Sequence, residues 1–290
     1  MRVLILGASG MLGSAVFRVL NEKNNLEIFG SIRSVELRRF FSPLVADQLV
    51  VGCDVSNYDE LVRIFELVKP EIVINCISLA KNLLNAPSIL DIVPIYTLLP
   101  HRLARLCSII GARLVHISTD GVFTGLKGQY TEKDIPDARD IYGISKHLGE
   151  VNYSHAITLR TSIIGPELKG KDGFLEWFLS QQIQCRAFSR AIFSGFPTNV
   201  LAEIIRDIVI PRPQLSGVYH VATQPISKLD LLRLIAHHYG KDIELVPDCK
   251  LVMDRSLDSA LFSKATGYFP PSWPELIDSM HSYHSNFART

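Results

Sequence analysis

The first half of the chain alternates short apolar runs with stretches in which apolar residues recur at helical spacing. Residues 2–7 are dominated by an apolar run typical of a buried strand, and residues 11–22 place their apolar side chains on one helix face. The alternation continues, with strands predicted at 26–32, 49–55, 71–75, 113–118 and 156–160 and helices at 58–68, 98–110 and 142–153. Because strands that alternate with helices build βαβ units, we expect an α/β fold with a doubly wound parallel (Rossmann) sheet.

The pattern loosens after Gly165. Helices are predicted at 173–182, 197–210 and 227–239 and in the tail up to about Tyr283, with a strand at 217–221. Because the sequence contains no repeat, low-complexity tract or flexible linker, we expect these segments to pack tightly on the sheet. We predict a first domain at 1–165 and a smaller C-terminal region at 166–290, in which the segment at about 192–221 returns to the first domain.

Composition narrows the class of protein. The chain has 290 residues, of which 47% are hydrophobic and 20% charged, so it is globular and long enough for a large core. The formal net charge of +1 gives no field that would attract DNA or an anionic membrane. The first apolar run is too short for a signal peptide, and no run approaches the ~18 residues of a membrane helix. We expect a soluble, cytoplasmic protein that binds neither nucleic acid nor membrane.

Cysteine and histidine spacing predicts no metal site. The five cysteines have neither metal-ligand nor CxxC spacing, and their odd number favours reduced, buried thiols over a disulfide framework. His281 and His284 lie three apart on a predicted helix, but no further ligand is near them in the sequence. We therefore expect no bound metal.

A glycine-rich turn follows the first predicted strand. It reads Gly7-Ala-Ser-Gly-Met-Leu-Gly13 and opens a predicted helix, which is the context that a phosphate-binding turn needs. The glycines let the backbone approach a pyrophosphate, and the helix N-terminus offers N–H groups and the positive end of its dipole. A tight strand-to-helix connection is the alternative. We predict that a dinucleotide contacts Gly7, Ser9, Gly10, Met11 and Leu12.

The end of the second predicted strand selects the nucleotide. NAD binders usually place an acid there to bind the ribose 2′-hydroxyl, but residues 30–34 contain none. Arg33 can pair with a 2′-phosphate through its planar guanidinium, so NADPH is favoured over NADH, unless Arg33 is only a solvated loop residue. Asp54 either accepts a hydrogen bond from the adenine amino group or caps the following helix. Further cofactor contacts are expected from Val55, Cys76 and Ile77, and for Cys76 we favour packing over a role as nucleophile.

Tyr142 and Lys146 are spaced i, i+4 on a predicted helix, so they are neighbours on one face. The unperturbed phenol pKa of ~10 is too high for easy proton exchange, and a nearby ammonium is expected to lower it. Lys146 can also reach the ribose hydroxyls of a nicotinamide nucleotide. The pattern YxxxK is weak alone, but here it follows a glycine turn and a strand that ends in Ser118-Thr119.

Four motifs together resemble the extended short-chain dehydrogenase/reductases, and among them the dTDP-4-dehydrorhamnose reductase group. They are Gly7 to Gly13, Ser118 to Phe123, Tyr142 to Lys146 and Leu159 to Ser162, and the likeness covers nearly the whole chain. The resemblance implies a catalytic triad of Thr119, Tyr142 and Lys146. It also implies that NADPH reduces the C4 ketone of a nucleotide-activated 6-deoxy sugar, in deoxysugar or polysaccharide biosynthesis. Tyr142 would then donate the proton, and Thr119 would hold the ketone oxygen.

Substrate recognition is expected mainly from the C-terminal region. A sugar diphosphate needs cations, for which the candidates are Lys81, Arg186, Arg190 and Arg255, with a surface charge as the alternative for each. Arg255 is favoured because its stretch resembles the family. The aromatic candidates for the pocket wall are Phe123, Trp177 and Phe193, with a core role as the alternative for Trp177 and Phe193. The expected partner is a nucleotide-sugar substrate. Whether the protein forms a homodimer is left open.

Departures from the family leave the product open. Gly121 stands where the family usually has an aromatic or another larger side chain, and Ile163 follows Arg-Thr-Ser where rhamnose-forming enzymes have an aromatic one. A UDP-linked or another dTDP- or GDP-linked 4-keto sugar is therefore comparable with the rhamnose precursor. Two other functions stay open, an epimerase with tightly bound NAD and a catalytically silent NADP-binding regulatory subunit.

Overall fold

A computed structural model of the chain describes residues 1–23, 25–79, 88–170 and 172–287. Its centre is a seven-stranded sheet with the order β3-β2-β1-β4-β5-β6-β11, in which every neighbouring pair is parallel. These strands are β1 (Arg2–Leu6), β2 (Glu27–Ile32), β3 (Leu49–Val51), β4 (Ile72–Asn75), β5 (Arg113–Thr119), β6 (Ala156–Thr161) and β11 (Gly217–His220). The expected doubly wound parallel sheet is confirmed.

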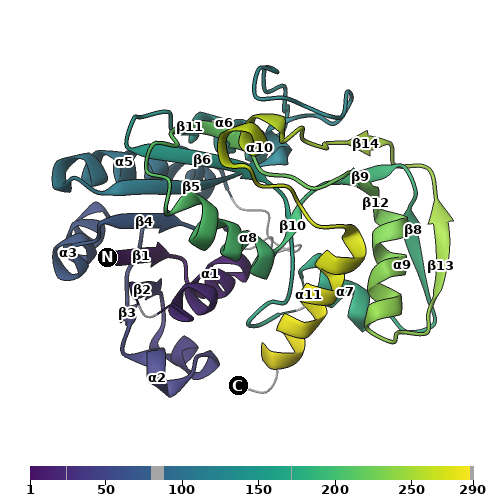
Figure 1. Cartoon of the computed structure of the whole chain (residues 1–290), viewed down its shortest axis with the longest axis horizontal. Coiled ribbons are helices and arrows are strands. Elements are labelled where there is room, and N and C mark those ends of the chain that lie inside the picture. Colours follow the sequence, from purple (N-terminus) through teal and green to yellow (C-terminus); the bar gives the residue numbers. More distant parts are fainter. Residues whose placement is uncertain (24, 80–87, 171, 288–290) are drawn as a thin grey trace.

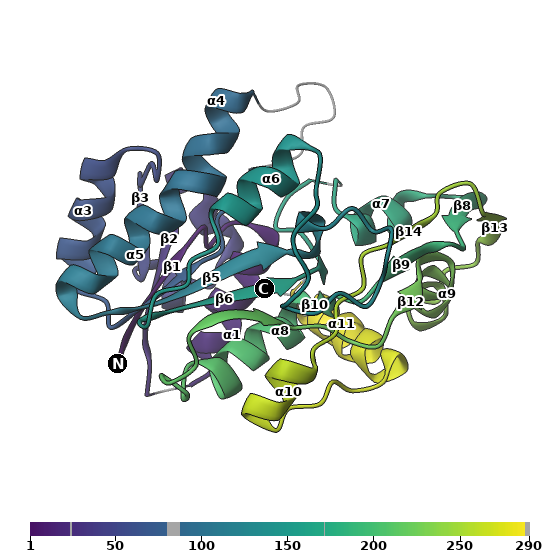
Figure 2. The ribbon, with the colours of Figure 1, turned by 90° about the horizontal axis from the view of Figure 1, so that it is seen from above.

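Helices cover both faces of this sheet (Figure 2). On one face α1 (Met11–Asn21) packs beside α8 (Thr198–Ile204), which continues into the π-helical turn η4 (Ile205–Val209). Over the other face lie α3 (Tyr58–Val68), α5 (Leu99–Ile110) and α6 (Ile141–Leu148). Each face has its own apolar cluster, since α1 brings the fully buried Phe17 to one and α5 brings the fully buried Leu103 to the other.

The connections between strands contain short elements that position the site. Between β2 and β3 lie η1 (Val35–Phe40) and α2 (Pro43–Ala46), and η3 (Asp120–Val122) follows β5 directly. Before α5, α4 (Ile89–Ile92) and the π-helical turn η2 (Val93–Leu98) extend the helix beyond its predicted start. Two elements are shorter than predicted. β3 ends at Val51 because Gly52 has a positive φ of 81°, and α6 ends at Leu148 because Gly149 caps it.

The C-terminal region forms a smaller lobe beside the carboxyl ends of the strands (Figure 1). It holds α7 (Phe174–Ser180), α9 (Lys228–His238) and α11 (Trp273–Phe287), whereas α10 (Ala260–Thr266) packs against β11, where Phe262 meets Tyr219 edge-on at 6.1 Å. Its short strands pair as β8 (Gln184–Phe188) with β13 (Glu244–Asp248), as β9 (Ala191–Phe193) with β12 (Ile226–Ser227) and β14 (Met253–Asp254), and as β7 (Ile163–Ile164) with β10 (Phe196–Pro197). From this half of the chain α8 and β11 lie with the large sheet, and the division of domains after residue 165 stays a prediction.

The described residues also bear on the bulk expectations. None of their helices is both long and apolar enough to cross a membrane. They contain no group of three or more His, Cys, Asp or Glu side chains arranged to hold a metal. Four of the five thiols are free and buried, whereas Cys249 is free but exposed, which differs from the expectation of buried thiols throughout.

Candidate functional site

The glycine turn lies where β1 meets α1. Gly7 has a φ of 81°, and its N–H donates to Ser31 Oγ at 3.1 Å. A Cβ at Gly7 would lie 3.0 Å from Ile77 Cδ1 and 3.3 Å from the Cys76 backbone, so the missing side chain lets the end of β4 pass. Gly10 is the N-cap of α1 and has no side chain to bond the N–H groups of the first turn. The turn thus presents backbone donors at the edge where a pyrophosphate is expected.

Cys76 and Ile77 therefore stand beside the turn, as expected from their places in the sequence. The Cys76 N–H donates to the Leu6 carbonyl at 3.1 Å. Burial raises the pKa of the Cys76 thiol to about 12, which keeps it protonated. A protonated, buried thiol is a poor nucleophile, so its environment is that of a packing residue.

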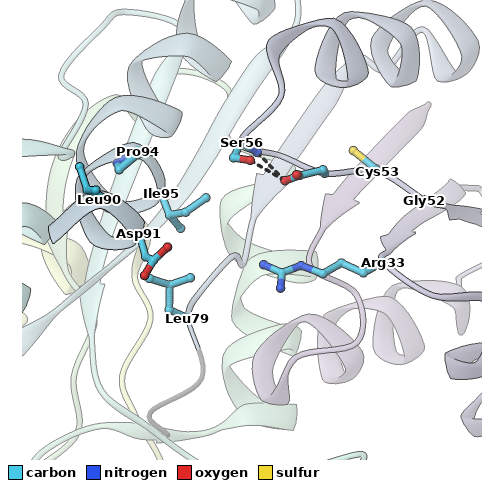
Figure 3. Close-up of a pocket in the computed structure, with 10 residues that line it drawn as sticks. Arg33, Gly52, Cys53, Ser56, Leu79, Leu90, Asp91, Pro94 and Ile95 are labelled. Atoms are coloured by element: carbon cyan, nitrogen blue, oxygen red, sulfur yellow. Dashed lines mark hydrogen bonds between the residues drawn. The ribbon is translucent and has the colours of Figure 1, made fainter. Parts of the chain in front are cut away.

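A cavity of about 580 Å³ opens beyond the ends of β2 and β3 (Figure 3). Arg33 after β2 lies on one side, and η2 lies opposite with Pro94 and Ile95. Asp54 after β3 also lines the cavity. The other lining residues are Gly52, Cys53, Ser56, Leu79, Leu90 and Asp91. Figure 3 shows the Arg33 guanidinium pointing into this space. An exposed cation at the tip of β2 can meet a phosphate there.

Asp54 holds the loop after β3. Its Oδ1 accepts hydrogen bonds from the N–H and the hydroxyl of Ser56, at 3.0 and 2.7 Å. These bonds, and the charge of Arg33, hold the pKa of the Asp54 carboxyl below its usual range. The N-cap of α3 is Asn57, so the alternative that Asp54 caps this helix is wrong. Val55 is buried in the core and is not among the residues that line the cavity, so its contact with the cofactor stays a prediction.

Thr119, Tyr142 and Lys146 meet where β5 ends and α6 begins. Thr119 Oγ1 accepts from the Gly121 N–H at 3.0 Å, donates to Asp120 Oδ1 at 3.2 Å, and hydrogen-bonds with the Tyr142 side chain. Lys146 Nζ donates to the Ile117 carbonyl at 2.7 Å. One strand end and one helix face therefore bring together all three residues of the expected triad.

The phenol of Tyr142 is tuned by burial. Burial raises its pKa to about 12, and the hydrogen bond with Thr119 opposes that shift. The expectation that Lys146 lowers this pKa is wrong for the protein alone, because the acting charges are those of Tyr96, Asp120 and Asp140, which raise it. Tyr142 therefore holds its proton at neutral pH, which is the state that a proton donor needs.

Lys146 occupies a tight site. The residue is 6% exposed, and burial lowers its ammonium pKa to about 8, against opposing contributions from Glu150 and Cys76. Lys146 Nζ lies 5.4 Å from the ring centroid of Tyr96, whose ring in turn meets the Tyr142 ring edge-on at 5.4 Å. Sequence reasoning missed Tyr96, because no local pattern links a helix before α5 to the helix that carries the triad.

The substrate side begins at Asp120. Burial raises the pKa of this carboxyl, whereas the charge of Arg255, a hydrogen bond with Thr119 and the charge of Lys228 lower it. Arg255 thus lies within electrostatic reach of the triad, and its buried Nε has no hydrogen-bond partner among the described residues. Lys228 opens α9 and was missed, since the sequence there shows only a capping pattern. These two cations are the best-placed described candidates for an anionic substrate.

The other residues predicted to bind substrate differ in how deeply their side chains are buried. Trp177 on α7 is 39% exposed and stacks on Phe174 at 5.9 Å, and Phe193 on β9 is half-buried against Trp273 at 5.8 Å. Phe123 is fully buried and stacks on Tyr130 at 4.1 Å, so it lies in the core and not on the expected pocket wall. Lys81 lies outside the described residues.

Comparison with known proteins identifies the family. The family model described as the RmlD substrate binding domain matches residues 1–251. The chain belongs to this family. The resemblance drawn from the four motifs is thereby confirmed, and the parallel sheet matches the fold of solved similar proteins.

Three similar proteins differ in how much of their length and of this chain the similarity covers. Methionine adenosyltransferase 2 subunit beta of Xenopus laevis is 26% identical over 244 residues, which are 76% of this chain and 66% of that protein. The dTDP-4-dehydrorhamnose reductase of Aggregatibacter actinomycetemcomitans is 24% identical over 309 residues, covering 97% of this chain and 99% of that protein. The solved dTDP-4-dehydrorhamnose reductase of Bacillus anthracis, in complex with NADP, has a TM-score of 0.78 at 21% identity and covers 97% of this chain and 99% of its own.

Proposed function

We propose that the protein is an NADPH-dependent reductase of the C4 ketone of a nucleotide-activated 6-deoxy sugar. The observation that carries this proposal is the meeting of Thr119, Tyr142 and Lys146 at the carboxyl end of the parallel sheet, the edge at which the glycine turn also follows β1. In open α/β sheets this edge is where ligands bind. The similarity to dTDP-4-dehydrorhamnose reductases over nearly the whole chain supports the same reaction class.

The residues present fit a dinucleotide phosphate. The α1 N-terminus and the turn from Gly7 to Gly10 would hold the pyrophosphate, and Arg33 would hold the 2′-phosphate at the cavity beside Asp54. Lys146 would bond the ribose hydroxyls next to the triad. The NADP complex of the Bacillus anthracis structure supports the choice of cofactor.

The side chains divide the work of reduction. The cofactor, when bound, supplies the hydride. Thr119 Oγ1 would hold the ketone oxygen, and Tyr142 would give its proton to the alkoxide that develops there. Because burial keeps this phenol protonated, the proton is in place before the reaction starts. Positioned proton transfer of this kind typically contributes about 10²–10⁴ in rate.

The test is a substrate panel. The purified protein is mixed with NADPH and with dTDP-, UDP- and GDP-linked 4-keto-6-deoxy sugars, and the absorbance of the reduced cofactor is followed. We expect NADPH oxidation with at least one nucleotide form. An enzyme that oxidises NADPH with none of them would contradict the proposal.

A second candidate is a non-catalytic subunit of another enzyme. The similarity to methionine adenosyltransferase 2 subunit beta, a protein named as a subunit, favours it. The complete set of Thr119, Tyr142 and Lys146 argues for turnover instead. Tight NADPH binding without oxidation of NADPH on any sugar of the panel would favour the subunit role.

A further inference from the structure

A buried ionic network lies directly behind the triad. Its centre is Glu150, two residues beyond the end of α6, whose side chain is 5% exposed. Glu150 accepts two hydrogen bonds from Arg160 of β6, from Nε and Nη2, each at 2.7 Å. It also accepts one from the Ser118 hydroxyl at 2.8 Å, and His147 Nδ1 lies 3.1 Å away. The carboxylate thus joins α6, β5 and β6 at one point.

The contact with Ser118 and the position of Glu150 itself both adjoin residues of the triad. Ser118 stands between Ile117, whose carbonyl holds Lys146 Nζ, and Thr119. Glu150 also follows Lys146 by four residues, and its charge favours the ammonium form of that side chain. We propose that Glu150 is a positioning residue, which supplies the buried counter-charge of Lys146 and fixes the end of β5 that carries Thr119. This inference rests on the proposed function.

The network continues toward the substrate side. Arg160 Nη1 lies 3.2 Å from His220 Nε2, and because a guanidinium only donates, His220 Nε2 accepts. His220 Nδ1 then carries the proton and donates to the Tyr130 carbonyl at 2.9 Å. Tyr130 bonds the segment after Arg255, through its N–H to the Ser256 carbonyl at 2.9 Å. Glu150 is therefore connected by hydrogen bonds to the stretch that follows Arg255.

The groups that face Lys146 allow its change of charge to be recognised in a pH profile. They are Glu150, Cys76 from β4, His116 from β5, Tyr96 from η2 and Tyr142. Burial raises the pKa of Cys76 and of Tyr142 to about 12, and it lowers the pKa of His116 well below its usual value. Lys146, with its pKa lowered to about 8, changes charge near neutral to mildly alkaline pH, whereas the shifted pKa values of Cys76, Tyr142 and His116 lie away from that range.

The charge of Lys146 determines the direction in which NADPH affinity and kcat change with pH. Lys146 acts as the ammonium, so NADPH affinity and kcat should fall as pH rises through its pKa. Removing the negative charge of Glu150 makes the ammonium less stable and moves this fall to lower pH. We expect a displacement of about one pH unit or more in Glu150→Gln. A purely structural role would scale both quantities down without moving the midpoint.

The experiment compares the pH dependence of NADPH binding, followed by protein fluorescence, and of kcat on a keto sugar. Glu132→Gln is the matched control. This carboxylate accepts a hydrogen bond from the backbone N–H of His220 at 2.7 Å but does not face Lys146. Its midpoint should stay at the wild-type pH. Glu150→Gln leaves the buried Arg160 unpaired, so Glu150→Gln/Arg160→Met serves as a second variant, and the displacement should persist in it.

The outcomes separate this inference from the proposed function. Midpoints of both Glu150 variants that coincide with the wild type would overturn the role of Glu150. A wild-type protein that binds NADPH but reduces no keto sugar would overturn the proposed function, while the binding curves would still decide whether Glu150 sets the charge of Lys146.

Discussion

The cofactor side and the substrate side of the site are built differently. On the cofactor side, consecutive strands of one parallel sheet end together, and Lys146 is held at 6% exposure between β5, η2 and Glu150. On the substrate side, the candidate residues come from short strands and the starts of helices, and Trp177 is 39% exposed. A lobe of this kind can change its contacts without disturbing the sheet. Under the proposed function, the reaction type would therefore be tied to the sheet, and the choice of sugar to the lobe.

The largest effect is expected at Tyr142. Replacing Tyr142 by Phe removes the proton donor and keeps the ring against Tyr96, so kcat should fall by about 10²–10⁴ while NADPH affinity is retained. Steady-state kinetics and a fluorescence titration with NADPH measure both. Tyr153→Phe is the control, since that exposed hydroxyl lies 3.3 Å from His101 Nδ1 on the surface. Equal kcat in Tyr142→Phe and wild type would remove Tyr142 from its proposed role.

Arg33 tests the cofactor side through specificity. In Arg33→Gln a charged contact to the 2′-phosphate is lost, worth about 1.5–3 kcal/mol, so NADPH affinity should fall roughly 10- to 100-fold. NADH affinity should change little. Arg39→Gln is the matched control, because the Arg39 guanidinium lies over the Phe40 ring at 4.9 Å and does not line the cavity. An unchanged ratio of the two affinities would show that Arg33 is only a solvated loop residue.

Arg255 tests the substrate side in the same way. Arg255→Met keeps the aliphatic stem but removes the cation near Asp120, so KM for the keto sugar should rise about tenfold. NADPH affinity should be unaffected, because the residue belongs to the lobe. Arg233→Met, at an exposed position of α9 where the guanidinium pairs with Asp230 at 2.8 Å, should leave both constants unchanged. A loss of NADPH affinity in Arg255→Met would break the separation of the two sides.

Gly121 should show the smallest effect. A Cβ there would lie 3.1 Å from Tyr142 Cε1 and 3.2 Å from Thr119 Oγ1, so Gly121→Ala must displace the phenol by a few tenths of an ångström. An off-rotamer cost of about 1 kcal/mol corresponds to roughly a fivefold fall in kcat. Kinetics on the same keto sugar measure it. A higher kcat in Gly121→Ala than in the wild type would contradict this expectation and show that a side chain at position 121 improves the site.

The sheet and its edge were predictable, because β1 and the strands after it have continuous apolar runs and the glycine turn fixes where the first one ends. Tyr142 and Lys146 were predictable for the same reason, since an i, i+4 pair lies on one helix face. Tyr96, Lys228 and Glu150 were not predictable, because their roles arise from packing between elements that are distant in sequence. The same limit applies to Phe123, which the motif placed near the triad but which packs inward on Tyr130.

The direction of the Tyr142 pKa shift also needed the structure. The spacing to Lys146 indicated a lowered phenol pKa, but the depth of the hydroxyl decides the sign, and depth is set by β5, η2 and α6 together. Burial is the largest cause of the raised pKa of Tyr142, and the charges of Tyr96, Asp120 and Asp140 act in the same direction. Tyr142 is therefore a protonated phenol at neutral pH, and not a phenolate.

The central claim is that hydride passes from the cofactor to C4 of the sugar. NADPH carrying deuterium at C4 of its nicotinamide ring is incubated with the protein and the panel of 4-keto-6-deoxy sugar nucleotides, and the sugar product is examined by NMR and mass spectrometry. The account predicts a product with deuterium at C4 of the sugar and an equal amount of oxidised cofactor. A recovered sugar without deuterium, with the cofactor still reduced, would contradict it.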